Sequence, residues 1–520
     1  MRRWHWSYVP ALALAVTVAV SCGDDELAVP VSGSGGEVAE EVQGVPTAQY
    51  YADNCSGCHG VTRGGATGPA LTPERLTASP DVYRSTIKDG RTGTVMPAWG
   101  GQLSSRDIDA LVAFLRFTEP EPAPEWTMDD IRASHEVLVP DDQLATAPAH
   151  DGNLENLMLV TEREARSIAV IDGDTHRLLG HIEASYRAHG YTFSPTDPRW
   201  AYNLGRDGWL FKIDLYTLEP VRKVRIGVDA RGVAMSDDGR FIVAGNYAPA
   251  TAVIVDANTL EPLEYIETVA PNPDGQMVPS RVAIVSDVAP ELVGPYFLLA
   301  LKEAGQVWRV DWSDPEFGIT KLADVGHILH DGFLSPDNKT FYLASQADNF
   351  MAAIDVASMT LRDRIDTGTT PHPGSGAAWE AGGVQYGATV HAGEGKVTIW
   401  DLSDDQIVGT VPTPGPGLFV RSHHSSPYVW ADAVFGDPPN NIVVFEKAPP
   451  FEVVGVIEDG VRTVHPEFTA DGRFTYVSDW DGNVVRVYDA TTLEKVAEID
   501  GIETPTGIFN TSRRHETLGH

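Results

Sequence analysis

The chain has 520 residues, and 73 acidic residues against 38 basic ones give it a formal charge of −35. This length exceeds what one hydrophobic core usually organises, so we expect two domains. The charge argues against nucleic acid and anionic membrane surfaces as partners and suits encounter with a basic electron carrier.

The first 22 residues have the features of an export signal. Arg2 and Arg3 precede an apolar run that ends at Cys22 and is too short to span a bilayer. Segment 1–22 resembles a bacterial lipoprotein signal, although Ala19 stands where that family usually has leucine. On this interpretation Cys22 becomes the lipidated first residue, and ordinary secretion with cleavage nearby is the alternative. Both predict a protein of the periplasm or the outer face of a bacterial membrane.

Two stretches without periodic hydrophobicity separate the predicted domains. Residues 23–44 are mainly Gly, Ser, Val and acidic residues, which predicts a flexible linker. Residues 119–124 alternate glutamate or alanine with proline and begin a stiffer linker, which we assign to 119–149. A small domain at 45–118 and a large one at 150–520 remain.

The small domain begins with the motif CSGCH, from Cys55 to His59, which is the attachment signature of c-type haem. The thiols of Cys55 and Cys58 can add to the two vinyl groups of one porphyrin, and His59 is placed to ligate the iron. A disulfide or zinc site would need a thioredoxin-like surround or further Cys and His ligands, which are missing nearby. The motif therefore predicts covalent haem c and a redox protein.

The rest of the small domain is predicted to be all-α, with helices at 48–54, 81–88 and 105–117. The last helix begins at Ser104 or Ser105 and has a helically spaced apolar stripe, namely Ile108, Leu111, Val112 and Leu115. This order resembles a class I cytochrome c, in which a methionine before the final helix is commonly the second iron ligand. Met96 is the only methionine in 45–118, so we expect it to ligate the iron; a core-filling role is the alternative.

Residues 150–520 contain eight copies of one pattern, an apolar strand that ends in an acidic residue and is followed by a turn and another strand. These acidic positions are separated by 42 to 55 residues: Asp172, Asp214, Asp256, Asp311, Asp355, Asp401, Glu446 and Asp489. Strand-length pieces with a period near forty are typical of propeller blades. We predict an all-β, eight-bladed propeller, with a solenoid as the competing architecture.

A second repeated element, a Ser-Pro or Asp-Gly turn, predicts where a site lies. Residues about five positions before this turn should line the central channel. The histidines and arginines at or near this position are His189, Arg231, Arg281, His330, His372, Arg421 and, one residue out of step, His465. A single repeated histidine would be a structural feature of the blades. Histidines and arginines at one level instead predict a shared anionic cavity, where one imidazole can ligate metal and others can donate protons.

A c-type cytochrome followed by an eight-bladed propeller resembles the cytochrome cd1 family. The resemblance rests on RAH at 187–189 with GRDG at 205–208, LHDG at 329–332, TPHPG at 370–374 and TPTG at 504–507. It implies non-covalent haem d1, with His189 as proximal ligand and His330 and His372 over the distal face. Four arginines could then pair with the carboxylates of the macrocycle or lie between blades: Arg206, Arg231, Arg281 and Arg421.

The resemblance leaves two activities open. The preferred one is reduction of nitrite to nitric oxide with electrons passed from haem c to haem d1, because His330 and His372 can supply the two protons that this reaction consumes. The alternative is maturation of haem d1, by dehydrogenation of dihydro-haem d1 with haem c as electron acceptor or by carriage of haem d1. In the dehydrogenation, His465 would be an acid–base residue that acts on a propionate side chain.

Three features favour the maturation alternative: Cys22, His465 and the tail at 507–515, which resembles the d1-binding proteins of haem d1 assembly. His465 could instead be a strand residue without chemistry. A third class, a propeller interaction protein, is argued against by the channel histidines. The expected redox partner is a small cytochrome c or cupredoxin, the expected membrane contact is only a lipid anchor, and a homodimer is left open.

Overall fold

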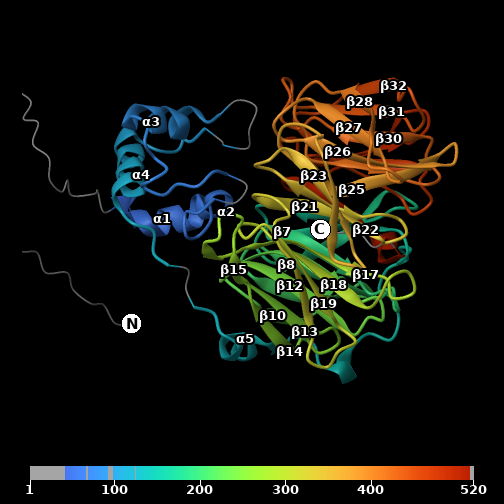
Figure 1. Cartoon of the computed structure of the whole chain (residues 1–520), viewed down its shortest axis with the longest axis horizontal. Coiled ribbons are helices and arrows are strands. Elements are labelled where there is room, and N and C mark those ends of the chain that lie inside the picture. Colours follow the sequence, from blue (N-terminus) through green and yellow to red (C-terminus); the bar gives the residue numbers. More distant parts are fainter. Residues whose placement is uncertain (1–40, 66–67, 92–95, 97, 123–124, 516–520) are drawn as a thin grey trace, which may run out of the picture.

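The computed structural model of the chain describes residues 41–65, 68–91, 96, 98–122 and 125–515. It consists of a small helical domain beside a large β-propeller (Figure 1). The predicted signal 1–22 with Cys22 and residues 23–40 of the first linker lie outside the described residues. Within the described part, no helix is both long and apolar enough to cross a membrane.

The small domain folds around its last helix. Its described elements are β1 (Glu41–Val42), β2 (Val45–Pro46), α1 (Thr47–Asn54), α2 (Ser56–His59), α3 (Pro80–Asp89) and α4 (Ser105–Phe117). The predicted apolar stripe of α4 is buried. Ser104 caps this helix, because its hydroxyl accepts the Asp107 N–H at 3.2 Å while the Asp107 carboxylate accepts the Ser104 N–H at 3.1 Å. The three predicted helices are confirmed as α1, α3 and α4.

The propeller has eight four-stranded antiparallel units, described here from inner to outer strand. The first blade contains β37 (Pro505–Asn510), β4 (Leu157–Glu162), β5 (Ser167–Asp172) and β6 (Arg177–Glu183), and the second contains β7 (Ala188–Phe193), β8 (Trp200–Gly205), β9 (Trp209–Asp214) and β10 (Glu219–Arg225). The third contains β11 (Asp229–Met235), β12 (Phe241–Ala248), β13 (Thr251–Asp256) and β14 (Pro262–Glu267), and the fourth contains β17 (Val282–Val288), β18 (Tyr296–Leu301), β19 (Gln306–Asp311) and β20 (Ile319–Leu322).

The remaining four blades repeat the same order. The fifth contains β21 (Leu329–Leu334), β22 (Thr340–Ser345), β23 (Phe350–Asp355) and β24 (Thr360–Ile365), and the sixth contains β25 (Pro371–Ala381), β26 (Val384–His391), β27 (Lys396–Asp401) and β28 (Ile407–Pro412). The seventh contains β29 (Val420–Ser422), β30 (Tyr428–Asp432), β31 (Asn441–Glu446) and β32 (Val453–Glu458), and the eighth contains β33 (Thr463–Phe468), β34 (Phe474–Asp479), β35 (Val484–Asp489) and β36 (Lys495–Ile499). The predicted eight-bladed propeller is confirmed.

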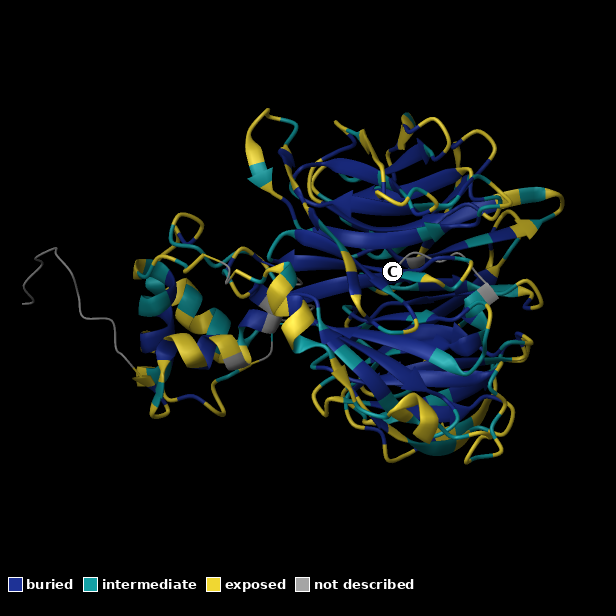
Figure 2. Cartoon of the chain, turned by 90° about the horizontal axis from the view of Figure 1, so that it is seen from below, coloured by how far each residue is buried: buried dark blue, intermediate teal, exposed yellow. Residues whose placement is uncertain are grey.

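The first strand of each blade faces the axis, since the first strands of neighbouring blades contact one another. The ring closes at the first blade, where the C-terminal strand β37 pairs with β4, for example Ile508 opposite Val160. A short helical turn, η2 (Thr511–His515), follows β37. Buried residues concentrate in the sheets, and exposed residues lie in the loops (Figure 2).

The seven aspartates among the repeated acidic residues accept hydrogen bonds in the turns after the third strands. In the third blade, Asp256 Oδ1 accepts the N–H groups of Asn258 at 2.9 Å and Thr259 at 2.7 Å. Asp489 does the same in the eighth blade. A short carboxylate that satisfies the N–H groups two and three residues ahead stabilises such a turn. The acidic repeat is therefore structural.

The second linker differs from its sequence-based assignment, because its described part beyond residue 125 packs on the propeller. It contains α5 (Met128–Ser134), β3 (Glu136–Val137) and a short turn, η1 (Asp141–Gln143). Strand β3 pairs with β10 as a fifth strand of the second blade. Trp126 Nε1 donates to the Arg225 carbonyl at 2.8 Å, and Ile131 is fully buried. A Thr127–Asp130 capping box begins α5, a signal that the sequence contained.

One buried histidine of the sixth blade makes the stability of the propeller depend on pH. His391 is fully buried, its Nε2 lies 3.0 Å from Thr398 Oγ1, and burial lowers its pKa to about 4. The unfolded chain takes up this proton near pH 6.5 and the folded chain only near pH 4, so stability is lost as pH falls between these values. The loss approaches about 3 kcal/mol.

This is tested by denaturant unfolding at pH 7 and pH 4.5 of the wild-type protein and a His391→Gln variant. We expect the variant to lose about 2 to 3 kcal/mol less on acidification than the wild type, whatever its stability at pH 7. An equal loss in both proteins would show that His391 does not resist protonation.

Candidate functional site

The haem-attachment motif lies at the end of α1 and in α2, around a buried histidine. His59 Nδ1 lies 2.8 Å from the Pro69 carbonyl, which can only accept, so Nδ1 carries a hydrogen and Nε2 keeps its lone pair. Burial lowers the pKa of His59, which keeps the ring neutral. A neutral imidazole held at Nδ1 by a carbonyl is the usual arrangement of a metal-binding histidine. The site therefore fits haem c.

The other predicted haem residues are only partly described. Cys55 is half-buried, and the side chain of Cys58 lies outside the described part of the chain. Met96 is half-buried before α4, and its carbonyl accepts the Arg91 N–H at 3.1 Å. The assignment of Met96 as second iron ligand remains a prediction. Haem c would be held by Cys55, Cys58, His59 and Met96.

The structure places the predicted propeller residues around the channel at the beginnings of inner strands. These positions are His189 in β7, Arg231 in β11, Arg281 before β17, His330 in β21, His372 in β25, Arg421 in β29 and His465 in β33. Arg206 directly follows β8. The turns that begin these strands bring together residues up to about 280 positions apart in sequence, which only ring closure achieves.

Asp331, which the sequence analysis did not single out, is the centre of one cluster. It is buried, and its Oδ1 lies 2.9 Å from Arg231 Nη2 and 2.9 Å from His330 Nδ1. Its Oδ2 lies 3.4 Å from His372 Nε2. Burial opposes ionisation of Asp331, but His330 and Arg231 outweigh burial and hold its pKa well below the usual range. The only sequence signal was its place beside His330.

The two histidines of this cluster lie beside each other. Their ring centroids are 5.0 Å apart. Burial lowers the pKa of His330 well below the usual value and also lowers that of His372, although Asp331 opposes both shifts. His372 Nδ1 lies 3.0 Å from the Leu418 carbonyl, which fixes a hydrogen on that nitrogen. A neutral His330 with its hydrogen on Nδ1, the nitrogen nearest Asp331, would keep a basic lone pair on Nε2.

Each of the four predicted arginines pairs with a carboxylate of the protein. The distances from Nη2 to the nearest carboxylate oxygen are 2.8 Å for Arg206 and Asp229, 2.9 Å for Arg231 and Asp331, 2.5 Å for Arg281 and Glu303, and 3.3 Å for Arg421 and Glu467. Tyr247 and Lys302 are buried among the first three arginines, and these cations together outweigh the burial of Tyr247 and lower its pKa. The charges of these four arginines are therefore at least partly compensated by carboxylates of the protein itself.

His465 belongs to a second cluster, beside the first. It is fully buried, and its Nδ1 accepts the Ile508 N–H at 3.0 Å, so the neutral ring carries its hydrogen on Nε2. That nitrogen lies 4.0 Å from Glu467 Oε2. Glu467 also pairs with Arg421 and with Arg513, and the Arg513 contact was not foreseen from the sequence.

Aromatic rings join the two clusters. The centroid of the Phe419 ring lies 6.3 Å from that of His372. Phe419 also stacks on His465, with ring centroids 4.0 Å apart and an interplanar angle of 10°. Phe509 lies 5.2 Å from His465 and stacks on Tyr191 at 4.4 Å. A row of rings is a suitable wall for a flat conjugated macrocycle. The sequence analysis missed Phe419, Phe509 and Tyr191, because aromatic residues occur throughout the strands.

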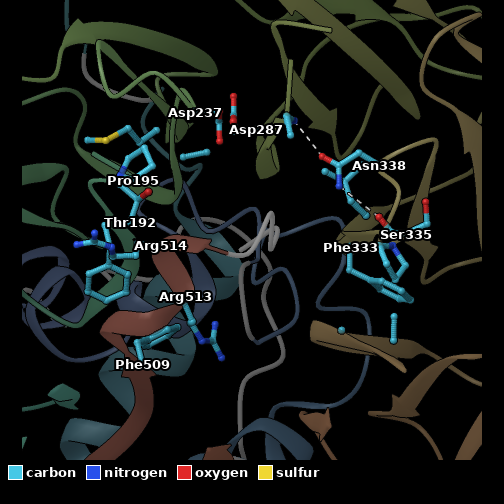
Figure 3. Close-up of a pocket in the computed structure, with 18 of the residues that line it drawn as sticks. Thr192, Pro195, Asp237, Asp287, Phe333, Ser335, Asn338, Phe509, Arg513 and Arg514 are labelled. Carbon is cyan, nitrogen blue, oxygen red and sulfur yellow. Dashed lines mark hydrogen bonds between the residues drawn. The ribbon is translucent and has the colours of Figure 1, made fainter. Parts of the chain in front are cut away.

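A cavity of about 640 Å³ lies along the channel toward the far ends of the inner strands. Asp237 and Asp287 face Arg513 and Phe509 across it (Figure 3). Arg421 also contributes to its lining, so this cavity and the His465 cluster share a wall.

Comparisons with known proteins agree with this geometry. A family model described as "Cytochrome D1 heme domain" matches residues 152–514, and one described as "Cytochrome C oxidase, cbb3-type, subunit III" matches residues 46–115. The chain belongs to the cytochrome d1 haem domain family. Its fold and its cytochrome domain make it an oxidoreductase of the cytochrome cd1 type.

Members of the cytochrome d1 family with two different names are similar to nearly the whole chain. The "Dihydro-heme d1 dehydrogenase" of Pseudomonas aeruginosa is 34% identical over 474 residues, which cover 90% of this chain and 94% of that protein. The "Nitrite reductase" of Stutzerimonas stutzeri is 31% identical over 520 residues, which cover 89% of this chain and 91% of that protein. The solved structure "Dihydro-heme d1 dehydrogenase NirN in complex with DHE" has a TM-score of 0.73 and 33% identity, and covers 90% of this chain and 99% of its own. These matches favour the dehydrogenase alternative over the nitrite reductase that the sequence analysis preferred.

Proposed function

We propose that the protein is a dihydro-haem d1 dehydrogenase that passes electrons to its own haem c. The observation that carries the proposal is the setting of His330 and His372, whose pKa values are lowered by burial and which lie beside Asp331 and the Leu418 carbonyl. Neutral imidazoles accept protons. Dehydrogenation releases protons, whereas reduction of nitrite consumes them, so this pair suits the oxidation.

The reaction converts a propionate side chain of the substrate into an acrylate. Two C–H bonds break on adjacent carbons, one C=C bond forms, and two protons and two electrons leave the substrate. The site must therefore hold the carboxylate, accept protons and pass electrons on. Haem c, when bound, accepts one electron at a time, so each turnover requires a second electron carrier outside the chain.

His330 is the best-oriented proton acceptor among the described residues. Its Nδ1 lies 2.9 Å from Asp331 Oδ1, and with its hydrogen on that nitrogen the ring would leave Nε2 as the basic atom. A buried carboxylate that orients a histidine and stabilises its protonated form is a common design for a general base. The proximal ligand of the tetrapyrrole would be His189, and the tetrapyrrole would be held without covalent bonds.

His465 would hold the carboxylate of the reacting side chain. The Ile508 N–H occupies Nδ1, so the neutral ring presents an N–H donor at Nε2. Phe419 and Phe509 fix the ring plane and exclude water, which strengthens a hydrogen bond from Nε2 to an anion. The proposal therefore gives His465 a chemical role. The alternative from the sequence was a strand residue without chemistry.

The cellular setting of this function is also a proposal. Haem c would be attached through Cys55 and Cys58, and Cys22 would carry a lipid that tethers the protein on the periplasmic side of a membrane. The external electron acceptor would be a small cytochrome c or cupredoxin with a basic face, which complements the formal charge of −35. Homodimer formation is left to measurement.

The proposal is tested by mixing anaerobic holoprotein with dihydro-haem d1 and a one-electron oxidant. We expect the spectrum of haem d1 to appear and two equivalents of oxidant to be consumed for each haem d1 formed. A Cys55→Ala/Cys58→Ala variant, which cannot attach haem c, should bind dihydro-haem d1 but convert it far more slowly. No conversion by the holoprotein in the presence of oxidant would refute the dehydrogenase function.

Nitrite reduction remains a second candidate because two adjacent histidines, 5.0 Å apart, flank one side of the site. Holoprotein loaded with haem d1 and given a reductant and nitrite would then form nitric oxide at catalytic rates. Because both histidines are neutral near pH 7, we expect turnover to be slow there and to rise as pH falls. Fast turnover at pH 7 that is lost in a His330→Ala variant would favour the reductase instead.

A further inference from the structure

The connection between the third and fourth blades is longer than the other connections. Asp256 and Asp311 are 55 residues apart, and the additional residues form the hairpin of β15 (Val269–Pro271) and β16 (Met277–Pro279). The hairpin is closed at its base by Thr268 Oγ1, which donates to the Ser280 carbonyl at 2.6 Å. Strand β15 lies on the side of the propeller that faces the cytochrome domain (Figure 1).

Arg281 directly follows this hairpin and joins the two domains. Its backbone N–H donates to Glu303 Oε2 at 2.8 Å, and its Nε donates to Glu303 Oε1 at 2.6 Å. Both the backbone and the side chain are thus fixed by one carboxylate. The guanidinium then donates from Nη1 to the carbonyl of Gly65, in the cytochrome domain.

Gly65 belongs to the loop that fixes the haem c ligand. Its N–H donates to the His59 carbonyl at 2.8 Å. Its φ of +87° is in the region that favours glycine, and a Cβ there would lie 2.9 Å from the Ala70 nitrogen, so this position requires glycine. The carbonyl that Arg281 binds therefore belongs to a residue that is hydrogen-bonded directly to His59.

On the propeller side, Arg281 continues into the Asp331 cluster. Its guanidinium lies 4.9 Å from the centroid of the Tyr247 ring. Arg231 donates from Nη1 to Tyr247 Oη at 3.3 Å and from Nη2 to Asp331 Oδ1 at 2.9 Å. A continuous series of contacts therefore runs from the loop of His59 to Asp331, the centre of the proposed proton-accepting site.

We propose that Arg281 is a positioning residue that holds the cytochrome domain in one orientation on the propeller and so sets the electron path between the two haem sites. A proline-rich linker alone leaves the relative orientation of two domains variable, and a charge-assisted hydrogen bond between them restricts it. The docking claim stands apart from the reaction; only its electron-transfer readout rests on the proposed function.

The docking claim is tested on full-length protein that contains haem c and no tetrapyrrole. A protease specific for glutamate should cut the linker after Glu125 faster when the domains separate; Glu119 and Glu121 each precede proline and resist cleavage. We expect Arg281→Ala to raise the cleavage rate about tenfold and Arg281→Lys to raise it less, because lysine keeps the charge but not the fork of donors. Arg364→Ala is the matched control, since Arg364 Nη2 also donates to a carbonyl, that of Asp324 at 2.7 Å, within the propeller.

A second readout follows electrons in protein loaded with haem d1. After rapid photochemical reduction of haem c, we expect electron transfer to haem d1 to be at least about tenfold slower in Arg281→Ala than in wild type or Arg364→Ala, with haem d1 affinity unchanged. If Arg281→Ala does not fold, Glu303→Gln can replace it, because this variant weakens the ion pair that orients the Arg281 guanidinium. It should also raise the cleavage rate and slow electron transfer, but by less than Arg281→Ala.

Equal cleavage and equal electron-transfer rates in Arg281→Ala and Arg364→Ala would overturn the inference. Lower haem d1 affinity with unchanged cleavage would also overturn it, because Arg281 would then bind the macrocycle as the sequence analysis expected. A wild-type protein that fails to oxidise dihydro-haem d1 but shows the cleavage difference would refute the dehydrogenase function and leave the docking role intact.

Discussion

Replacing His465 by alanine is expected to reduce the conversion of dihydro-haem d1 by about a hundredfold or more. The variant loses the Nε2 donor that we assign to the substrate's carboxylate, and it loses the ring that stacks on Phe419 and meets Phe509 edge to face. The reacting carbons would then no longer be held near the proton acceptor. Binding of the tetrapyrrole should persist, because the proposed axial ligand, His189, is on another blade. Anaerobic single-turnover spectra measure the rate, and titration with haem d1 measures the affinity.

The matched control is His176→Gln, which also removes an imidazole from the propeller. His176 is on the outer side of the first blade, where its Nδ1 lies 2.6 Å from Tyr476 Oη. This variant should convert dihydro-haem d1 at nearly the wild-type rate. A His465→Ala protein that keeps a rate within a few-fold of wild type would remove His465 from the reaction.

Replacing Asp331 by asparagine should have the largest combined effect on stability and on the site. Arg231 loses its carboxylate partner in a buried place, and leaving such a charge uncompensated costs about 3 kcal/mol or more. The group beside His330 Nδ1 becomes an uncharged amide, which stabilises the protonated ring less, and the loss of such a supporting carboxylate typically costs about tenfold or more in affinity or activity. Thermal unfolding and haem d1 titration measure the two losses separately.

Asp214→Asn separates the local effect from general destabilisation. Asp214 is buried in the second blade and accepts from Arg199 Nε at 2.9 Å and Nη2 at 2.6 Å, so it is also a buried partner of an arginine. We expect this variant to lose stability comparably while haem d1 affinity and conversion stay unchanged. If both variants lower haem d1 affinity equally, Asp331 has only a structural role.

The fold was predictable from the sequence because its signals are local and repeated. A strand that ends in an acidic residue recurs eight times, and each copy identifies one blade from its own local sequence. The CSGCH motif and the stripe of α4 identified the small domain in the same way. The second linker was less predictable, because α5 and β3 gain their order from packing on the second blade.

The site was predictable in position but not in connections. The position before each turn located His189, His330 and His372 at the inner strands. The sequence could not show that Asp331 joins Arg231 to His330 and His372, since its contacts with Arg231 and His372 cross between blades. The sequence also suggested that the histidines are proton donors, whereas burial lowers the pKa of His330 and His372. That difference of protonation separates the two candidate reactions.

The closure of the ring by β37 ties the site to the end of the chain. The strand that pairs with β4 also contributes the Ile508 N–H that sets the tautomer of His465, the Phe509 ring beside it and, directly after, the Arg513 that pairs with Glu467. They follow all the other described strands of the propeller in the chain. A chain that lacks this segment would therefore have neither a closed ring nor a complete site.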